Sequence, residues 1–178
     1  MPVCFMGALR SVTGMTQNKR DDPVGMAPPL ISLAALFIGL GLDQLLPIGF
    51  AEVFAPRTPR AAVAAFVGAV AIWIGIREYM VIRRVNKPVN RGPGQPVATL
   101  VMTGIYASTR NPMYQCQGLL LLALAVRFAS DWTLLLLIPW ALVMHFGVVL
   151  REERYLEELL GDEYRHYKKH VPRYGWPF

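Results

Sequence analysis

Residues 113–150 read "MYQCQGLLLLALAVRFASDWTLLLLIPWALVMHFGVVL", and this stretch decides the fold. It holds two apolar runs, Met113 to Arg127 and Asp131 to Leu150, which meet at the connector "RFAS" (127–130). A connector this short permits only a tight turn between antiparallel helices, and Ser130 or Asp131 can cap the second helix. We therefore predict a helical hairpin over residues 113–150. Its first helix, of about 15 residues, is short for a membrane crossing, which takes about 20.

Two longer apolar segments precede the hairpin, Ala27 to Phe50 and Arg60 to Ile82. Pro28 and Pro29 suit the first turn of a helix, and Pro47 marks the end of the first segment. Hydrophobic residues make up 54% of the 178-residue chain and charged residues 17%, against roughly 25% charged in soluble domains. We therefore expect an all-α integral membrane protein with about four transmembrane helices.

Lys and Arg residues are unevenly distributed between the two sides that four crossings would define. Fourteen of the 18 lie in the N-terminal segment, in residues 83–112 and in the C-terminal segment, which share one side. Because positive residues concentrate in cytoplasmic loops, we expect a multi-pass protein with both termini in the cytoplasm. Residues 1–26 are expected to form a mobile or surface-lying leader, since no apolar run there precedes a small-residue cleavage site.

The sequence contains no pattern typical of a metal site or a nucleotide-binding sheet. Cys4 and Cys116 are far apart and have no metal-ligand spacing. The three histidines form no HExxH motif, and no GxGxxG motif follows a strand-like run. We therefore expect no bound metal and no Rossmann sheet, and the expected partner is the lipid bilayer rather than nucleic acid.

Two polar segments lie on the side expected to be cytoplasmic, and the first ends in "YASTRNPMY" (106–114). Pro112 is favoured in the first turn of a helix. The free N–H groups of a helix start suit a carboxylate or a phosphate, and Arg110 adds a positive charge. A simpler interpretation also fits, in which Arg110 reaches lipid headgroups while Tyr106 and Tyr114 lie at the membrane interface.

The second polar segment, residues 151–178, places Glu152 directly after an apolar span. A carboxylate that faces a helical bundle is costly unless it has a partner, and the expected partner is either Arg110 or a ligand. Further along, Gly161 is expected to separate two amphipathic helices. These helices should form a cytosolic C-terminal region that lies on anionic lipid.

Together the two segments resemble the isoprenylcysteine carboxyl methyltransferase family, which groups with phospholipid methyltransferases. The family pattern T-L-V-x-x-G-x-Y-x-x-x-R-H/N-P-x-Y is matched by "TLVMTGIYASTRNPMY" (99–114). Two membrane helices and a pair of glutamates follow, and then "GDEYRHYKKHVP" (161–172) matches G-x-E-Y-x-x-Y-x-x-x-V-P. The parts stand in the family's order and spacing across residues 95–178.

The resemblance implies a helical membrane enzyme that transfers a methyl group from S-adenosylmethionine to a lipophilic acceptor entering from the bilayer, and leaves S-adenosylhomocysteine. The cofactor site is expected on the cytosolic side. Glu152 and Arg110 carry the expected catalytic roles, because they can pair with the ammonium and the carboxylate of the cofactor. The cofactor-binding residues that the match implies are Ala98, Thr99, Leu100, Val101, Tyr106, Asn111, Pro112, Met113, Tyr114, Glu152, Tyr164, Tyr167 and Arg173.

Two positions depart from the prenylcysteine enzymes of this family. Asn111 stands where the eukaryotic members usually carry His, and Val148 stands where they place an Arg implicated in holding the substrate carboxylate. The favoured expectation is an isoprenylcysteine carboxyl O-methyltransferase. The alternative is a phospholipid or small-molecule N- or S-methyltransferase that uses the same pocket. A sterol-type reductase and a non-enzymatic membrane scaffold are the more distant possibilities.

The expected domain organisation has three parts. They are the leader (1–26), two transmembrane helices (27–82) and a methyltransferase core (83–178) that includes the hairpin and the C-terminal cap. The acceptor is expected to enter this core laterally, between helices, past Trp140, Met144 and the small-residue face of the second span.

Overall fold

The structure is a computed structural model that describes residues 27–51, 57–85 and 100–175. The leader and two expected cofactor residues, Ala98 and Thr99, lie outside these ranges. The described residues contain helices and no β-strand, so the predicted all-α fold is confirmed. The elements are α2 (Pro28–Leu45), α4 (Arg57–Val85), the 3-10 turn η1 (Gly104–Ala107), α5 (Pro112–Phe128), α6 (Asp131–Leu142), the π-helical η2 (Val143–Val149), α7 (Leu150–Leu160) and α8 (Asp162–His170).

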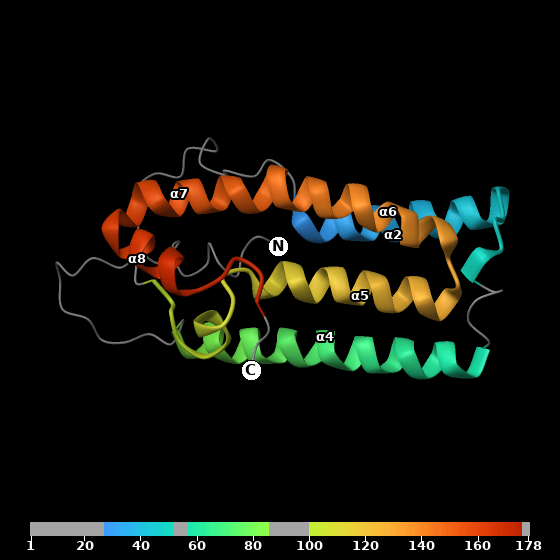
Figure 1. Cartoon of the computed structure of the whole chain (residues 1–178), viewed down its shortest axis with the longest axis horizontal. Coiled ribbons are helices and arrows are strands. Elements are labelled where there is room, and N and C mark those ends of the chain that lie inside the picture. The colour runs from blue at the N-terminus through green and yellow to red at the C-terminus, as the bar shows by residue number, and fades with distance from the viewer. Residues whose placement is uncertain (1–26, 52–56, 86–99, 176–178) are drawn as a thin grey trace.

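The long helices lie side by side and alternate in direction (Figure 1). α2 and α5 run one way, while α4 and the continuous α6–η2–α7 helix run back. α4 packs along α5, and α2 packs along α6. The short α8 turns back at Gly161, so that it lies at the same end of the bundle as η1 and the start of α5.

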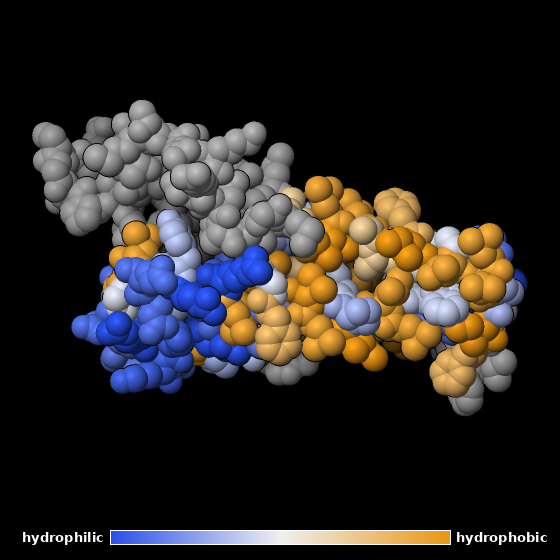
Figure 2. Space-filling model, turned by 90° about the horizontal axis from the view of Figure 1, so that it is seen from above, coloured by the Kyte–Doolittle hydropathy of each residue, from blue (hydrophilic) through white to orange (hydrophobic). Residues whose placement is uncertain are grey.

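Three helices are long and apolar enough to cross a membrane: Pro28–Leu45, Arg57–Arg84 and Asp131–Leu160. α5 has 17 residues, and it is short for a crossing, as the sequence predicted. Large apolar side chains point outward from the bundle, such as Phe66, which is 70% exposed. On the face seen in Figure 2, hydrophobic residues cover most of the bundle, and hydrophilic residues gather at the end that holds α7 and α8. Apolar surface of this extent marks a membrane-contacting protein.

The last long helix differs from its predicted bounds. It continues past Leu150 to Leu160, because the sequence beyond the apolar run, "REERYLEELL", is rich in strong helix formers. Pro139 lies inside this helix and lacks a backbone donor. The π-helical segment starts four residues later, at Val143, and the wider π turn is a feature often found at functional sites.

Polar residues at the end of the bundle away from α8 satisfy one another. Ser130 caps α6 as predicted, since its Oγ accepts a backbone N–H at 3.0 Å. The carboxylate oxygens of Asp131 accept the backbone N–H groups of Phe50 and Ala51 at 2.9 and 2.8 Å. Asp43, the acid inside the first span, accepts a hydrogen bond from the Ser130 hydroxyl. These bonds tie the end of α2 to the start of α6.

α2 approaches α6 closely at Gly39, where an added Cβ would overlap Oγ1 of Thr133. Gly41, two residues later on the same helix and facing the other way, has open space around it. We expect Gly39→Ala to lower the free energy of unfolding by about 1–3 kcal/mol through overpacking. Gly41→Ala should be neutral or stabilise by roughly 0.5–1 kcal/mol. Thermal unfolding of both variants in detergent measures the difference, and equal stabilities would contradict this close helix crossing.

Candidate functional site

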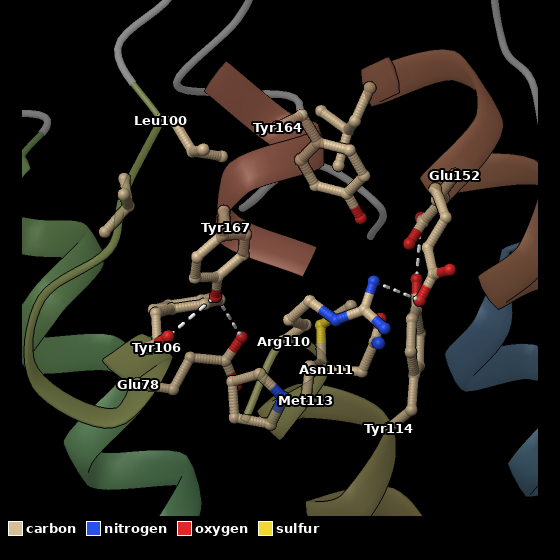
Figure 3. A pocket seen from close by; sticks show the side chains of 14 residues that line it. Glu78, Leu100, Tyr106, Arg110, Asn111, Met113, Tyr114, Glu152, Tyr164 and Tyr167 are labelled. Carbon is tan, nitrogen blue, oxygen red and sulfur yellow. Dashed lines mark hydrogen bonds and ion pairs between the residues drawn. The ribbon is translucent and has the colours of Figure 1, made fainter. Parts of the chain in front are cut away.

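A pocket opens at the end of the bundle that carries α8 (Figure 3). Its empty volume is about 500 Å³, which includes open solvent at its mouth. Side chains from α4, the η1 region, α5, α7 and α8 enclose it. The lining residues are Glu78, Leu100, Val101, Tyr106, Arg110, Asn111, Pro112, Met113, Tyr114, Glu152, Glu153, Leu156, Tyr164 and Tyr167.

Tyr106 joins three elements on one side of the pocket. The preceding Gly104 has a φ of +64°, a conformation that favours glycine, and an added Cβ there would lie 2.5 Å from a methyl group of Val81. This close approach sets η1 against α4, so that the Tyr106 hydroxyl donates to Oε1 of Glu78 at 3.0 Å. The Tyr106 carbonyl accepts a hydrogen bond from the Tyr167 hydroxyl at 2.6 Å. α4, η1 and α8 are therefore fixed relative to one another.

Glu153 is the centre of a buried ion-pair cluster that the sequence analysis missed. Its side chain is 6% exposed, and its Oε1 lies 2.9 Å from Nη1 of Arg110. Arg173 binds the same carboxylate through Nε at 2.8 Å and Nη2 at 2.9 Å, the bidentate geometry that favours Arg over Lys. The hydrogen bond to Glu153 raises the pKa of Arg173. Two cations from distant parts of the chain thus meet on one acid.

The expected pairing of Arg110 with Glu152 is wrong, because Arg110 binds the neighbouring Glu153. Successive residues of a helix point about 100° apart, so only one of the two acids faces Arg110. Glu152 instead accepts a hydrogen bond from the Tyr114 hydroxyl at 2.7 Å (Figure 3). Its second oxygen has no hydrogen-bond partner among the described residues. The other expected partner of Glu152, a ligand, therefore remains a prediction.

Arg110 is nearly buried, with 8% of its side chain exposed. Its Nε–H is buried and has no hydrogen-bond partner in the part of the chain that the structure describes. A buried donor without an acceptor costs about 1–3 kcal/mol, and more when it is charged. The Arg110 guanidinium points into the pocket (Figure 3), so an anionic ligand group there would remove this cost.

Asn111 lines the pocket, but its side chain holds the C-terminal segment. Its Nδ2 donates to the carbonyl of Arg173 at 3.3 Å, and it makes no capping bond to α5. The backbone N–H of Arg110 donates to the carbonyl of Pro172 at 3.1 Å, and Nε2 of Gln115 donates to that of Gly175 at 2.9 Å. Residues 172–175 are therefore bound along the start of α5.

An apolar cluster forms part of the pocket wall near α8. Leu100, Leu156, Tyr164, Tyr167 and Val171 pack together and are buried. Burial raises the pKa of Tyr164 to about 12, although the nearby Arg110 acts in the other direction. The phenol therefore stays neutral at physiological pH, and this side of the pocket is suited to a flat apolar group.

Most of the residues expected at the site are brought together. Of those within the described ranges, only Arg173 does not line the pocket, and it acts on the site through Glu153. The pocket also includes Glu78, Glu153 and Leu156, which the sequence reasoning did not select. A signal for Glu78 existed, since an acid inside an apolar span needs a partner, as does Glu152. Nothing in the sequence distinguished Glu153 from the adjacent Glu152.

A second, apolar cavity lies beside the pocket, between α5 and the α6–η2 helix. Its empty volume is about 1480 Å³, again including open space, and its lining includes Trp140 and Met144, the two residues named for the predicted acceptor path. Tyr114 lines both cavities and therefore stands between them. No lining residue in the described part of the chain carries a formal charge. The lining residues are Ile74, Tyr114, Gln115, Gly118, Leu119, Leu122, Leu137, Trp140, Ala141, Leu142, Met144, His145, Phe146 and Tyr174.

Potential metal ligands do not cluster within the described ranges, where no group of three His, Cys, Asp or Glu side chains is placed to hold an ion. His166 and His170 lie four residues apart on α8, with ring centroids 4.3 Å apart. No third ligand of these types joins them there.

The comparisons with known proteins agree with the sequence patterns. The sequence model of the phospholipid methyltransferase family matches residues 59–163, more than half of the chain. This segment runs from the start of α4 to the start of α8 and carries all three glutamates and two of the four tyrosines that line the pocket. No curated protein and no solved structure matches the chain significantly.

Proposed function

This chain belongs to the phospholipid methyltransferase family, which confirms the resemblance drawn from the sequence, and we propose that it uses S-adenosylmethionine to methylate a lipophilic acceptor. The observation that carries the proposal is a polar pocket at the hydrophilic end of a membrane-type bundle, next to an apolar cavity that shares Tyr114 with it as a lining residue. A methyl donor and a lipid-soluble acceptor require this pair of environments on either side of one reaction point.

The polar pocket offers a partner for each charged part of S-adenosylmethionine. The oxygen of Glu152 that lacks a partner among the described residues suits the ammonium group, and the buried Nε–H of Arg110 suits the carboxylate. Glu78 lies on the other side of the pocket (Figure 3), where its carboxylate suits the ribose hydroxyls. Tyr164 and Tyr167 offer aromatic faces to the adenine. With Glu78, the proposed core extends beyond residues 83–178 into α4.

The work of the protein is positioning rather than covalent chemistry. When bound, S-adenosylmethionine supplies an electrophilic methyl group on a positively charged sulfur. Tyr114 is held by Glu152 at the boundary of the two cavities, so its ring can face the sulfonium by a cation–π contact of about 0.5–2 kcal/mol. The Glu153 cluster fixes Arg110 and the C-terminal segment around the site. Alignment and exclusion of water supply most of the rate enhancement in such a transfer.

We propose that the acceptor enters the apolar cavity from the bilayer. In this arrangement the bundle crosses the membrane four times, with α5 as the shortest crossing. The end that holds α8 and the pocket faces the cytoplasm together with both termini. The excess of Lys and Arg on that side supports this orientation.

Two acceptor classes follow from the family, and one observation favours the second. A prenylcysteine carboxylate would need a cation, yet Val148 is 1% exposed inside an apolar cluster, and no charged side chain of the described residues lines the apolar cavity. A phospholipid amine or another lipophilic amine or thiol needs no such cation. We therefore favour the N- or S-methyltransferase type over the carboxyl O-methyltransferase type.

Product analysis tests the proposed function. Purified protein in nanodiscs is incubated with methyl-labelled S-adenosylmethionine and membrane extract, and the labelled products are separated into lipid, thiol and prenylcysteine fractions. We expect label in the lipid or thiol fraction. Label confined to the prenylcysteine fraction would favour the carboxyl O-methyltransferase type instead. Binding of NADPH in place of S-adenosylmethionine would support a reductase.

Filling the apolar cavity is expected to block the acceptor without touching the methyl donor. Ala141 lines the cavity, while Val143, two residues later, does not. The larger side chain in Ala141→Phe should clash with a bound acceptor at a cost of about 1–3 kcal/mol. We therefore expect this variant to raise the KM for the acceptor about tenfold or more. Val143→Phe should leave it unchanged. Steady-state kinetics measures both variants, with S-adenosylhomocysteine affinity as the control, and identical KM values would contradict the acceptor path.

A further inference from the structure

Among the described residues that line the apolar cavity there is one basic side chain, His145 of the π-helical segment. Nδ1 of His145 lies 3.0 Å from Oη of Tyr174, and both residues line the cavity. The remaining titratable group in the described part of the lining is the phenol of Tyr114 on α5. An imidazole beside a phenol in an otherwise apolar chamber is suited to receiving a proton.

The other polar side chains of the cavity are already engaged. The Tyr114 hydroxyl donates to Glu152 at 2.7 Å. Gln115 accepts from the Thr109 hydroxyl at 2.6 Å, and its amide donates to the Gly175 carbonyl at 2.9 Å. Within the described lining, this leaves His145 as the group able to exchange a proton with a molecule in the cavity.

Tyr174 is held in place by the same contacts that build the cofactor pocket. The preceding Arg173 is bound by Glu153, and the carbonyl of the following Gly175 accepts from Gln115. Burial raises the pKa of Tyr174, so its phenol stays neutral. The phenol oxygen can therefore accept the Nδ1–H of His145, which leaves the lone pair of Nε2 free.

We propose that His145, oriented by Tyr174, takes the proton of a lipophilic acceptor that carries an N–H or S–H group. This inference rests on the proposed methyl transfer. A carboxylate is already deprotonated at neutral pH, so it requires a cation and no base, whereas an amine or thiol must lose a proton. The cavity offers a base and no formally charged side chain in its described lining, so its chemistry matches the second kind of acceptor.

The step balances as a simple substitution. The lone pair of the acceptor nitrogen or sulfur forms the bond to the methyl carbon, the methyl–sulfur bond breaks, and its electron pair stays on the sulfur. The proton of the acceptor passes to Nε2 of His145, and Tyr174 stabilises the resulting imidazolium through Nδ1–H. Solvent at the cytosolic end then removes the proton.

Kinetics and nuclear magnetic resonance test this assignment together. General-base catalysis contributes about 10²–10⁴-fold, so we expect His145→Gln to lower kcat by that factor and to remove the rise of kcat with pH. Tyr174→Phe, which keeps the ring, should lower kcat about tenfold. Nitrogen-15 spectra of the three histidines in the protein bound to S-adenosylhomocysteine should show His145 with the proton on Nδ1 and the lone pair on Nε2, and Tyr174→Phe should change that signature. His166→Gln, on the exposed face of α8, is the matched control and should behave as wild type.

Each outcome separates this inference from the proposed function. Wild-type protein that binds no S-adenosylhomocysteine refutes the proposed function itself. If His145→Gln has the same kcat and the same pH profile as the wild type, the role of His145 is overturned while the proposed function stands. Release of labelled methanol from the product by mild alkali identifies a methyl ester, and that result overturns the assignment of an N–H or S–H acceptor while methyl transfer stands.

Discussion

Replacement of Glu153 by Gln is expected to lower the free energy of unfolding by about 3–5 kcal/mol, because removing one partner leaves buried charges uncompensated. Glu153 holds Arg110, which is 8% exposed, and Arg173, which is 31% exposed. The effect should fall toward the lower value, since solvent screens Arg173 in part. The neutral amide retains one acceptor oxygen but no charge. Thermal or denaturant unfolding in detergent measures the loss.

The control for this prediction is Glu158→Gln on the exposed side of the same helix. It changes the net charge in the same way and should leave stability unchanged. Glu153→Gln should also weaken S-adenosylhomocysteine binding, since Arg110 and the C-terminal segment lose their common anchor. Equal unfolding curves for the two variants would show that the ion-pair cluster does not hold the site together.

Replacement of Glu152 by Gln is expected to lower the affinity for S-adenosylhomocysteine about 10- to 100-fold, with little loss of stability. A hydrogen bond to a charged group contributes about 1.5–3 kcal/mol, and the amide cannot pair electrostatically with the ammonium of the ligand. Glu152 keeps a neutral partner in Tyr114, so its replacement leaves no buried cation unpaired. Isothermal titration in nanodiscs measures the affinity.

Two further variants frame this result. Glu163→Gln, at the exposed first turn of α8, removes the same charge outside the pocket and should bind normally. Tyr114→Phe removes only the hydroxyl that donates to Glu152 and should cost less affinity than Tyr114→Ala, which also removes the ring. If Glu152→Gln and Glu163→Gln bound equally well, Glu152 would not contact the ligand.

The fold was largely predictable because its signals are local. The length of each apolar run, the short "RFAS" connector, Ser130 as a cap and Gly161 as a break between helices each act within a few residues. The end of the fourth span was not predictable from hydropathy, since α7 continues as a helix after the apolar run stops. The end of this helix depends on the helix propensity of residues 151–160 and on the partners of Glu152 and Glu153. Those partners come from distant segments of the chain.

The candidate site was predictable as a set of residues but not as a set of contacts. Family motifs assembled Tyr106, Arg110 and Tyr114 with Glu152 around one pocket. The choice of Glu153 over Glu152 as the partner of Arg110 depends on the rotation of α7 about its axis, which η2 alters upstream. Glu78 was visible as an acid inside a span, yet only the packing of η1 on α4 turns it toward the pocket.

Equilibrium binding of S-adenosylhomocysteine to the wild-type protein in nanodiscs tests the central claim most directly. We predict saturable binding at one site per chain, competition by S-adenosylmethionine but not by NADPH, and strong weakening by Glu152→Gln and by Tyr114→Ala. Absence of saturable binding, or affinity that both substitutions leave unchanged, would contradict the assignment of this pocket to a methyl donor.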